Sequence, residues 1–433
     1  MTGADSASTS AAAAAGTMPP VQVTRGAMSL LTLIYTLNFV DRQIINILAE
    51  SIKVELALSD AQLGLLTGFS FALFYTVLGL PIARLADRSS RTAIISIAVF
   101  AWSFMTCLCG LAQSFVQMLL ARVGVAVGES GCTPAAHSLI SDWFPPQRRA
   151  SALAMYSLGV PLGTLFGMAL GGWIGHGLGW RVAFFVAGVP GMLLAAIAWW
   201  MLKEPARRER PLPADQQSSM LSVLAELSRS KALWCIAISM SLLSLLGYGQ
   251  AAFLGSFYLR VHELPLDRLG VALGLMLGLG GVAGVWTGGV IADRSGRGDP
   301  AAFVLLPAIG TLLAWPFAVG AFLVAQVWLS LGLLAVATAL NSLWLGPAFA
   351  AIQMIVRPDR RAMAVAAVTL VLTLIGLGCG PVLIGLISDA MAASVTAGEA
   401  LRFSLLCTTP LGAVAAGILL CARKPIRQEL VYA

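Results

Sequence analysis

Two charged side chains, Asp41 and Arg42, stand near the middle of the apolar stretch Leu30 to Leu48, which is long enough to cross a lipid bilayer. On insertion scales, each such charge at the centre of a membrane helix costs about 3 kcal/mol. A chain that keeps both charges must supply them with partners, water or a function inside the membrane. Because adjacent helical residues point about 100° apart, we expect Asp41 and Arg42 to have separate partners and separate roles.

A second pair of charges, Arg122 and Glu129, lies in another apolar stretch. The two residues are seven positions apart, so they share one helix face and differ in depth by about 10 Å. Counted from the ends of their stretches, Asp41 and Glu129 both lie about 20 Å from the same membrane side. The sequence therefore predicts that the two carboxylates face one cavity.

These residue types could form a proton switch. Burial favours the protonated form of a carboxyl, whereas a nearby arginine favours the charged form, so moving the arginine changes proton affinity. Protonating one carboxylate leaves a positive site that could hold a phosphate-bearing or other anionic head group. We predict that Asp41 and Glu129 carry protons, with Arg42 and Arg122 as charge partners or head-group ligands. The alternative is a pair of ion pairs that only fasten two helices together, although buried ion pairs stabilise less than apolar packing does.

The composition is that of an integral membrane protein, because 58% of 433 residues are hydrophobic, 11% are charged and the mean hydropathy is +0.86. The abundant glycines suit closely packed membrane helices, so we predict an all-α fold. Its expected spans are 28–50, 63–86, 92–111, 113–141, 150–174, 181–202, 232–259, 269–291, 301–323, 326–355, 362–387 and 401–421.

Lysine and arginine collect on one side of these spans, which predicts the topology. With the N-terminus in the cytoplasm, twenty of the 27 basic residues are cytoplasmic. Five are on the other side and two are within the membrane: Lys53, Arg181, Arg260, Arg268 and Arg402, then Arg42 and Arg122. We expect a multi-pass protein of the cell (inner) membrane with both termini cytoplasmic. The seven cysteines have no ligand-like spacing and are interpreted as packing residues, so we expect no metal and no cofactor.

The chain divides into two similar halves. The expected units are a disordered tail 1–27, a six-helix bundle 28–202, a linker 203–231, a second six-helix bundle 232–422 and a tail 423–433. The sequence around Asp87 and Arg88 is repeated around Asp293 and Arg294, and PxRRA at 146–150 is repeated at 358–362. Such repeats predict a duplicated unit that encloses a central site.

The chain resembles the major facilitator superfamily over everything after the tail. The Gly-x-x-x-Asp-Arg-x-Gly-Arg signature of that superfamily is complete at Gly289–Arg297, and Ala83 and Ser90 replace both glycines in the first half. Arg122-Val-Gly-Val-Ala-Val-Gly-Glu129 and the Gly/Pro-rich run from Gly159 are also similar to motifs of the family. The resemblance implies twelve helices in two bundles and a cytoplasmic gate that holds the outward-facing state, formed by Asp87, Arg88, Arg91, Asp293, Arg294 and Arg297.

Within that superfamily, NFVDRQ, GVAVGES and SDWFPPQRRASALA are similar to the spinster group, which implies transport of lipids such as lysophospholipids and sphingolipids. The second half carries no central charge, so an amphipathic substrate would place its head toward the first half and its tail toward the second. Residues of possible cavity contact are Asn38, Thr133, His137, Tyr248, Gln250, Asn341, Trp344, Thr369 and Thr373.

The leading hypothesis is a proton-coupled secondary transporter of lipid-like substrates that works by alternating access, as a symporter or an antiporter. A proton-coupled transporter of small organic anions or drugs would use the same residues. A passive scramblase or channel is the alternative of another class. The sequence has no HExxH motif and no Walker A motif, so we expect neither an enzyme nor an ATP-driven pump. The expected partners are the bilayer and a small lipid-like molecule, with no nucleic acid and a monomeric protein.

Overall fold

The computed structural model describes residues 21–205, 229–296, 299–357 and 360–429, and these residues are helices joined by short turns. The all-α prediction is confirmed. Helices satisfy their own backbone hydrogen bonds, which is what a chain inside lipid requires. Eleven continuous helices within the described residues are long and apolar enough to cross a membrane. The 35-residue α2 (Val21–Glu55) is a further long helix, and it carries Asp41 and Arg42.

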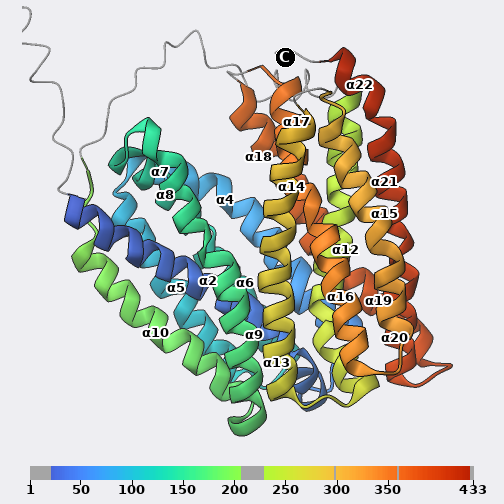
Figure 1. Cartoon of the computed structure of the whole chain (residues 1–433). Coiled ribbons are helices and arrows are strands. Elements are labelled where there is room, and N and C mark those ends of the chain that lie inside the picture. The colour runs from blue at the N-terminus through green and yellow to red at the C-terminus, as the bar shows by residue number, and fades with distance from the viewer. Residues whose placement is uncertain (1–20, 206–228, 297–298, 358–359, 430–433) are drawn as a thin grey trace, which may run out of the picture.

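The first bundle follows the expected order of spans (Figure 1). Its elements are α2, then α3 (Asp60–Gly64), η1 (Leu65–Phe69) and α4 (Ser70–Arg88), then α5 (Arg91–Leu111), α6 (Phe115–Glu129), α7 (Cys132–Trp143), α8 (Pro146–Ser157), α9 (Gly159–Leu178) and α10 (Trp180–Met201).

The second bundle is built in the same way. Its elements are α12 (Lys231–His262), α13 (Leu266–Leu275), η3 (Met276–Gly280), α14 (Gly281–Gly296), α15 (Ala302–Leu323), α16 (Val327–Asn341), η4 (Ser342–Trp344), α17 (Leu345–Ile355), α18 (Arg361–Leu372), η6 (Thr373–Cys379), α19 (Gly380–Ala392), α20 (Ala397–Thr408), α21 (Pro410–Cys421) and α22 (Arg423–Gln428).

The helix boundaries differ from the expected spans at both chain ends. The first helix begins at Val21, where a tail was expected up to residue 27, and residues 1–20 of that expected tail lie outside the described residues. Two prolines precede Val21 in the sequence, a position at which proline is compatible with the start of a helix. Residues 423–428 of the expected last tail form α22. Most of the expected linker, 206–228, also lies outside the described part.

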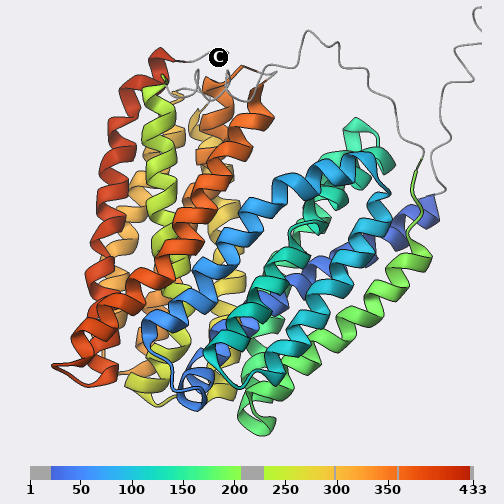
Figure 2. The ribbon, with the colours of Figure 1, turned by 180° about the vertical axis from the view of Figure 1, so that it is seen from behind.

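The two bundles meet at one end and diverge at the other (Figures 1 and 2). We call the end at which α2 begins and α22 ends the terminus face, and the other end the opposite face. The bundles diverge toward the terminus face. Contacts between them join α9 to α13, α3 to α19, and α2 to α12.

Small residues allow the backbones of the two bundles to approach closely. A methyl group added at Gly172 on α9 would lie 2.5 Å from the Leu266 carbonyl oxygen on α13. One added at Gly64 on α3 would lie 2.5 Å from the Pro381 carbonyl oxygen on α19. Both distances are too short for a real side chain, so glycine is required for the observed closure.

Three spans contain a short π-helical segment near the level at which the bundles meet: η1, η3 and η6. Segments of this kind insert an extra residue into a helix and are frequent at functional sites. Segment η1 packs against η6, and η3 packs against α9, so all three lie at contacts between the bundles.

Candidate functional site

The four intramembrane charges form two ion pairs between α2 and α6. Arg42 Nη2 and Nε each lie 2.7 Å from Glu129 Oε2, and Arg122 Nη1 lies 3.9 Å from Asp41 Oδ1. Asp41 and Arg42 thus contact different partners, as their adjacency requires. The side chains of Asp41, Arg122 and Glu129 are at most 4% exposed, whereas that of Arg42 is 21% exposed.

Several polar atoms of this cluster have no hydrogen-bond partner. They are Asp41 Oδ1, Glu129 Oε1, Arg122 Nε and Arg122 Nη1. The other oxygen of Asp41 accepts a hydrogen bond from the Thr106 hydroxyl on α5. A buried polar atom without a partner costs about 1–3 kcal/mol, and more when it is charged. The cluster is therefore held together but incompletely satisfied, which suits a site that accepts a proton or an anion.

Aromatic rings surround the Arg42 guanidinium. Its Cζ lies 5.2 Å from the ring centre of Phe39, 4.6 Å from that of Phe71 and 4.9 Å from that of Tyr75. Such contacts stabilise a cation by about 0.5–2 kcal/mol each. Sequence reasoning missed Thr106, Phe71 and Tyr75, because only the tertiary contacts of α4 and α5 with the charged helices reveal them. It also missed Phe39, although Phe39 and Arg42 are three positions apart on α2 and their contact is a local signal.

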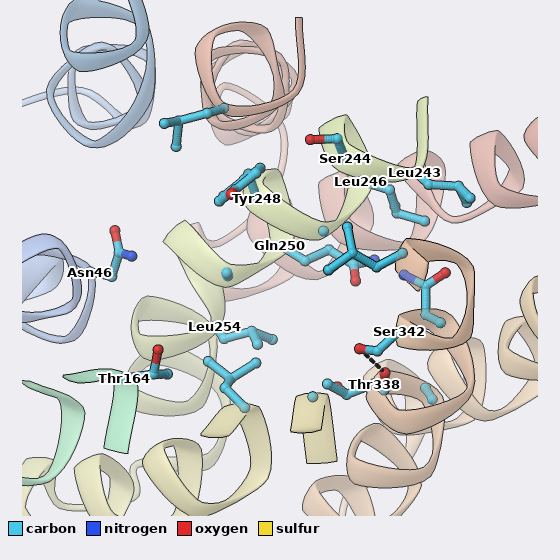
Figure 3. A pocket seen from close by; sticks show the side chains of 18 of the residues that line it. Asn46, Thr164, Leu243, Ser244, Leu246, Tyr248, Gln250, Leu254, Thr338 and Ser342 are labelled. Carbon is cyan, nitrogen blue, oxygen red and sulfur yellow. Dashed lines mark hydrogen bonds between the residues drawn. The ribbon is translucent and has the colours of Figure 1, made fainter. Parts of the chain in front are cut away.

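A cavity of about 420 Å³ lies between the bundles and extends into the second one. Arg42 and Arg122 line it on the side of the first bundle, whereas Asp41 and Glu129, which were expected to face one cavity, are not among its described lining residues. Four residues predicted for the cavity line it: Tyr248, Gln250, Asn341 and Trp344. Figure 3 shows Leu246 and Gln250 on the side of α12 that faces the other helices of the second bundle. Asn46 and Thr164 lie on the side of the first bundle.

The other five residues predicted for the cavity are not among its described lining residues. Asn38 lies beside Glu129, Thr133 lies beside Tyr156, and His137 meets the ring of Tyr156 edge-on at 5.5 Å. Thr369 on α18 is exposed and Thr373 begins η6. The residues of this span that line the cavity are Leu372 and Leu377. The two threonines were therefore predicted on the wrong face of their helix.

Of the six predicted gate residues, Arg91 has a well-defined set of partners. It is 3% exposed and binds Asp142 at 2.5 Å, Glu204 at 2.6 Å and Ser138 at 2.9 Å, and none of these partners belongs to the second bundle. Asp293 and Arg294 are exposed at the end of α14. The side chains of Asp87 and Arg88, and all of Arg297, lie outside the described residues.

Glu204 follows α10 and links it to the start of α5. Its carboxylate accepts hydrogen bonds from the Thr92 N–H at 3.0 Å and from Arg91 Nε at 2.6 Å. Partial burial raises the pKa of Glu204, but these hydrogen bonds outweigh burial and hold the pKa below its ordinary value.

A second charge cluster, which sequence reasoning missed, closes the opposite face. Its centre is Asp60 on α3, which binds Arg260 of α12 through two hydrogen bonds of 2.9 and 2.7 Å. Asp60 also binds Lys53 Nζ at 2.6 Å and the Ser388 hydroxyl at 2.7 Å. Arg260 in addition binds Glu50 at 2.6 Å. The capping box of Ser59 and Gln62 is the sequence signal that places Asp60 at a helix start.

The second bundle also supplies an acceptor to the first turn of α3. The carboxylate of Asp389 on α19 accepts hydrogen bonds from the backbone N–H groups of Asp60 and Ala61, at 2.9 and 2.8 Å. Free N–H groups at a helix start attract anionic side chains. In the sequence, Lys53 and Arg260 look like ordinary loop charges, since only the packing of the halves brings them together.

Comparison with known proteins identifies the family. The model of the Major Facilitator Superfamily matches residues 31–381. The chain is 34% identical over 405 residues to an MFS-type efflux pump of Mycolicibacterium smegmatis, with 94% of each chain covered. It is 26% identical over 288 residues to a probable L-galactonate transporter of Escherichia coli, covering 64% of this chain and 63% of that protein.

Two solved structures of a bacterial homolog to the human lysosomal transporter Spinster are also similar, one inward-facing and unoccupied, the other inward-facing and occupied. Their TM-scores are 0.88 and 0.86, each at 32% identity over 96% of this chain and 100% of theirs. The predicted resemblance is confirmed, and so is the expectation of a multi-pass transporter and not an enzyme. The chain belongs to the major facilitator superfamily.

Proposed function

We propose that this protein is a proton-coupled secondary transporter of single-chain, lipid-like anions such as lysophospholipids or phosphorylated sphingoid bases. The observation that carries the proposal is one cavity lined by two arginines from the first bundle and, from the second bundle, by uncharged side chains, many of them apolar. A substrate with an anionic head and an alkyl tail matches both sides.

The charged side has free donors for a head group. Arg122 lines the cavity, is 1% exposed, and has two guanidinium nitrogens without a hydrogen-bond partner. Arg42 lines the same cavity and is the more accessible of the two. Arginine binds phosphate and carboxylate groups through paired hydrogen bonds, so this side suits a phosphate-bearing head.

The other side, which we call the apolar chamber, lies inside the second bundle. It is bounded by α12, α15, α16 and α21 and has no charged residue in its described lining: apolar residues such as Leu246, Leu254, Ala314, Ala318 and Leu334 lie there beside polar ones such as Gln250, Thr338 and Asn341. An alkyl chain placed there would bury its CH₂ groups against these apolar side chains. Each buried CH₂ group contributes about 0.8 kcal/mol, so chain length should affect affinity strongly.

Proton coupling would act through Asp41 and Glu129. Each has one buried oxygen with no donor, and a proton would satisfy it. Protonation of either carboxyl also removes the counter-charge of an arginine that lines the cavity. Proton binding and head-group binding would then influence one another by linkage.

The orientation follows from the charge distribution. Among the described residues, most lysines and arginines lie at the terminus face, which supports a cytoplasmic location for both termini in a cell membrane. With that orientation, the divergence of the bundles toward the terminus face corresponds to an inward-facing state, and the similarity to two inward-facing structures agrees with it.

A second candidate is a proton-coupled transporter of small organic anions or drugs. The similarity to an efflux pump and to a probable galactonate transporter favours it. The cavity separates the two proposals, because a small sugar acid would leave the apolar chamber unfilled.

The test is transport by purified protein in liposomes under an imposed pH gradient. We expect uphill movement of a radiolabelled lysophospholipid, and loss of the proton-driven part in Asp41→Asn and Glu129→Gln but not in the exposed-residue control Glu399→Gln. Full proton-driven transport by both variants would overturn the assignment of the carboxylates. Downhill movement that ignores the gradient would indicate a scramblase, and uphill movement of a sugar acid alone would support the second candidate.

A further inference from the structure

The ring of Phe71 contacts both arginines of the charge cluster. Its ring centre lies 4.6 Å from Arg42 Cζ and 5.6 Å from Arg122 Cζ, and the side chain is 2% exposed. The ring also stacks on Tyr75 at 5.5 Å with an angle of 19° between the planes. The two ion pairs themselves involve only α2 and α6, so Phe71 brings a third helix, α4, into the cluster.

The same span touches the other bundle one turn away. Gly68, in η1, packs against the backbone of η6 so closely that an added methyl group would lie 2.5 Å from the Leu377 carbonyl oxygen. Between Gly68 and Phe71, the Ser70 hydroxyl donates to the Leu65 carbonyl oxygen five residues earlier, at 2.9 Å. This part of the span therefore contacts the second bundle through η1 and the arginines through Phe71.

We propose that Phe71 is a positioning residue that couples the two intramembrane ion pairs to the contact between the bundles. The inference rests on the proposed proton coupling and adds to it the route by which the ion pairs act on the gate. When a proton neutralises Asp41 or Glu129, the released guanidinium keeps the aromatic ring as its neighbour. A shift of either guanidinium then displaces Phe71. The adjoining π-helical segment, η1, passes this displacement on to η6.

The ionisable side chains around the two arginines come from five helices. They are Asp41 on α2, Glu129 on α6, Cys107 and Cys109 on α5, Tyr75 on α4, Tyr35 on α2 and Tyr248 on α12, with Arg42 and Arg122 as the permanent charges. Among them, Asp41 and Glu129 are the groups to which the proposed function assigns the proton, so the pH response is assigned to these two carboxyls.

The experiment measures the opening of the terminus face without substrate. Spin labels are placed at two exposed positions, through Gln147→Cys on α8 and Ser295→Cys on α14, after replacement of the exposed Cys379, Cys407 and Cys421. Distance distributions are recorded by electron–electron double resonance from pH 5 to pH 8. They are compared among the otherwise unchanged protein, Phe71→Leu, Phe71→Tyr and Phe39→Leu.

We expect the ratio of open to closed populations of the otherwise unchanged protein to change with pH. In Phe71→Leu, the pH-dependent change in this equilibrium constant should be about tenfold smaller. Phe71→Tyr keeps the ring and should retain the response. Phe39→Leu removes a ring whose arginine contact is to Arg42, at 5.2 Å, and should have the smaller effect. Phe71→Met is a second variant of similar volume for the case in which Phe71→Leu does not fold.

Two results would overturn the inference while leaving proton coupling intact. One is an unchanged pH response in Phe71→Leu or Phe71→Met, and the other is an equal loss in Phe71→Tyr. A merely structural role predicts a lower melting temperature at every pH with the pH response retained. Populations that ignore pH in the otherwise unchanged protein would overturn proton coupling itself, and this role of Phe71 with it.

Discussion

The guanidinium of Arg260 on α12 meets the carboxylate of Asp60 on α3 through two hydrogen bonds, and the two side chains are 7% and 3% exposed. These residues belong to different bundles, so their pair fastens the opposite face. Removing one partner of a buried pair typically costs about 3–5 kcal/mol, because the other charge stays buried without compensation. The pair therefore contributes to closure only while both partners are present.

The first prediction is that Arg260→Ala opens the opposite face. Asn46 lines the cavity, and Asn46→Cys reports entry of a membrane-impermeant maleimide from the side of the opposite face. We expect labelling to increase at least tenfold. The control is Arg402→Ala, which removes a more exposed pair with Glu399 on the same face and should have little effect. Equal labelling of the two variants would contradict the prediction.

The second prediction concerns the glycine contact between α9 and α13. In Gly172→Ala, the new methyl group would collide with the Leu266 carbonyl oxygen, and we expect about 1–3 kcal/mol of destabilisation of the closed opposite face. Gly177→Ala on the same helix is the matched control, because no atom lies within 4 Å of its added methyl group. Thermal unfolding in detergent and the same maleimide assay would measure the difference. If Gly172→Ala changed neither the unfolding temperature nor the labelling, the contact between α9 and α13 would be able to adjust to the added methyl group, and the prediction would be wrong.

The third prediction is a pH dependence of stability from Glu204. Its pKa is lowered in the folded state, so its contribution is present above the ordinary value of 4.5 and is lost as the pH falls through the folded pKa. At pH 7, Glu204→Gln should cost about 1 kcal/mol or less, since the group is partly exposed. Below pH 4.5 the melting curves of the variant and the unchanged protein should converge. Curves that stay parallel down to pH 3.5 would refute this.

The fourth prediction tests the apolar chamber. Ala318 lines the chamber on α15, and Ala318→Leu should shorten the space available to an alkyl chain. We expect stabilisation by an 18-carbon lysophospholipid to fall about tenfold in apparent affinity, and that by a 10-carbon analogue to change little. Melting temperatures measured across ligand concentrations give both affinities. A uniform loss for both chain lengths would mean that the tail does not enter the chamber.

The sequence predicted the helices and the charge pairs because those signals are local. Apolar runs of membrane-spanning length define helices wherever they occur, and the positions of Arg122 and Glu129 follow from helical periodicity. The separate partners of Asp41 and Arg42 likewise follow from their adjacency alone.

The rest depended on packing between helices that are distant in the sequence. Thr369 and Thr373 were expected in the cavity. The rotation of their helical span about its own axis is set by contacts of η6 with η1 and α12, which no local sequence pattern encodes. The Asp60 cluster draws on α2, α3, α12 and α19, and each of its charges by itself resembles an ordinary residue at a helix end. Only the assembled fold makes these residues neighbours.

The uninterrupted length of α2 has a mechanical consequence. Arg42 and Lys53 are eleven residues apart, which places them about three turns, or roughly 16 Å, apart along one face of a single rigid rod. Arg42 belongs to the intramembrane charge cluster and Lys53 to the Asp60 cluster. Because α2 is one continuous helix, a rotation about its axis would move both basic side chains and would act on both charge clusters at the same time.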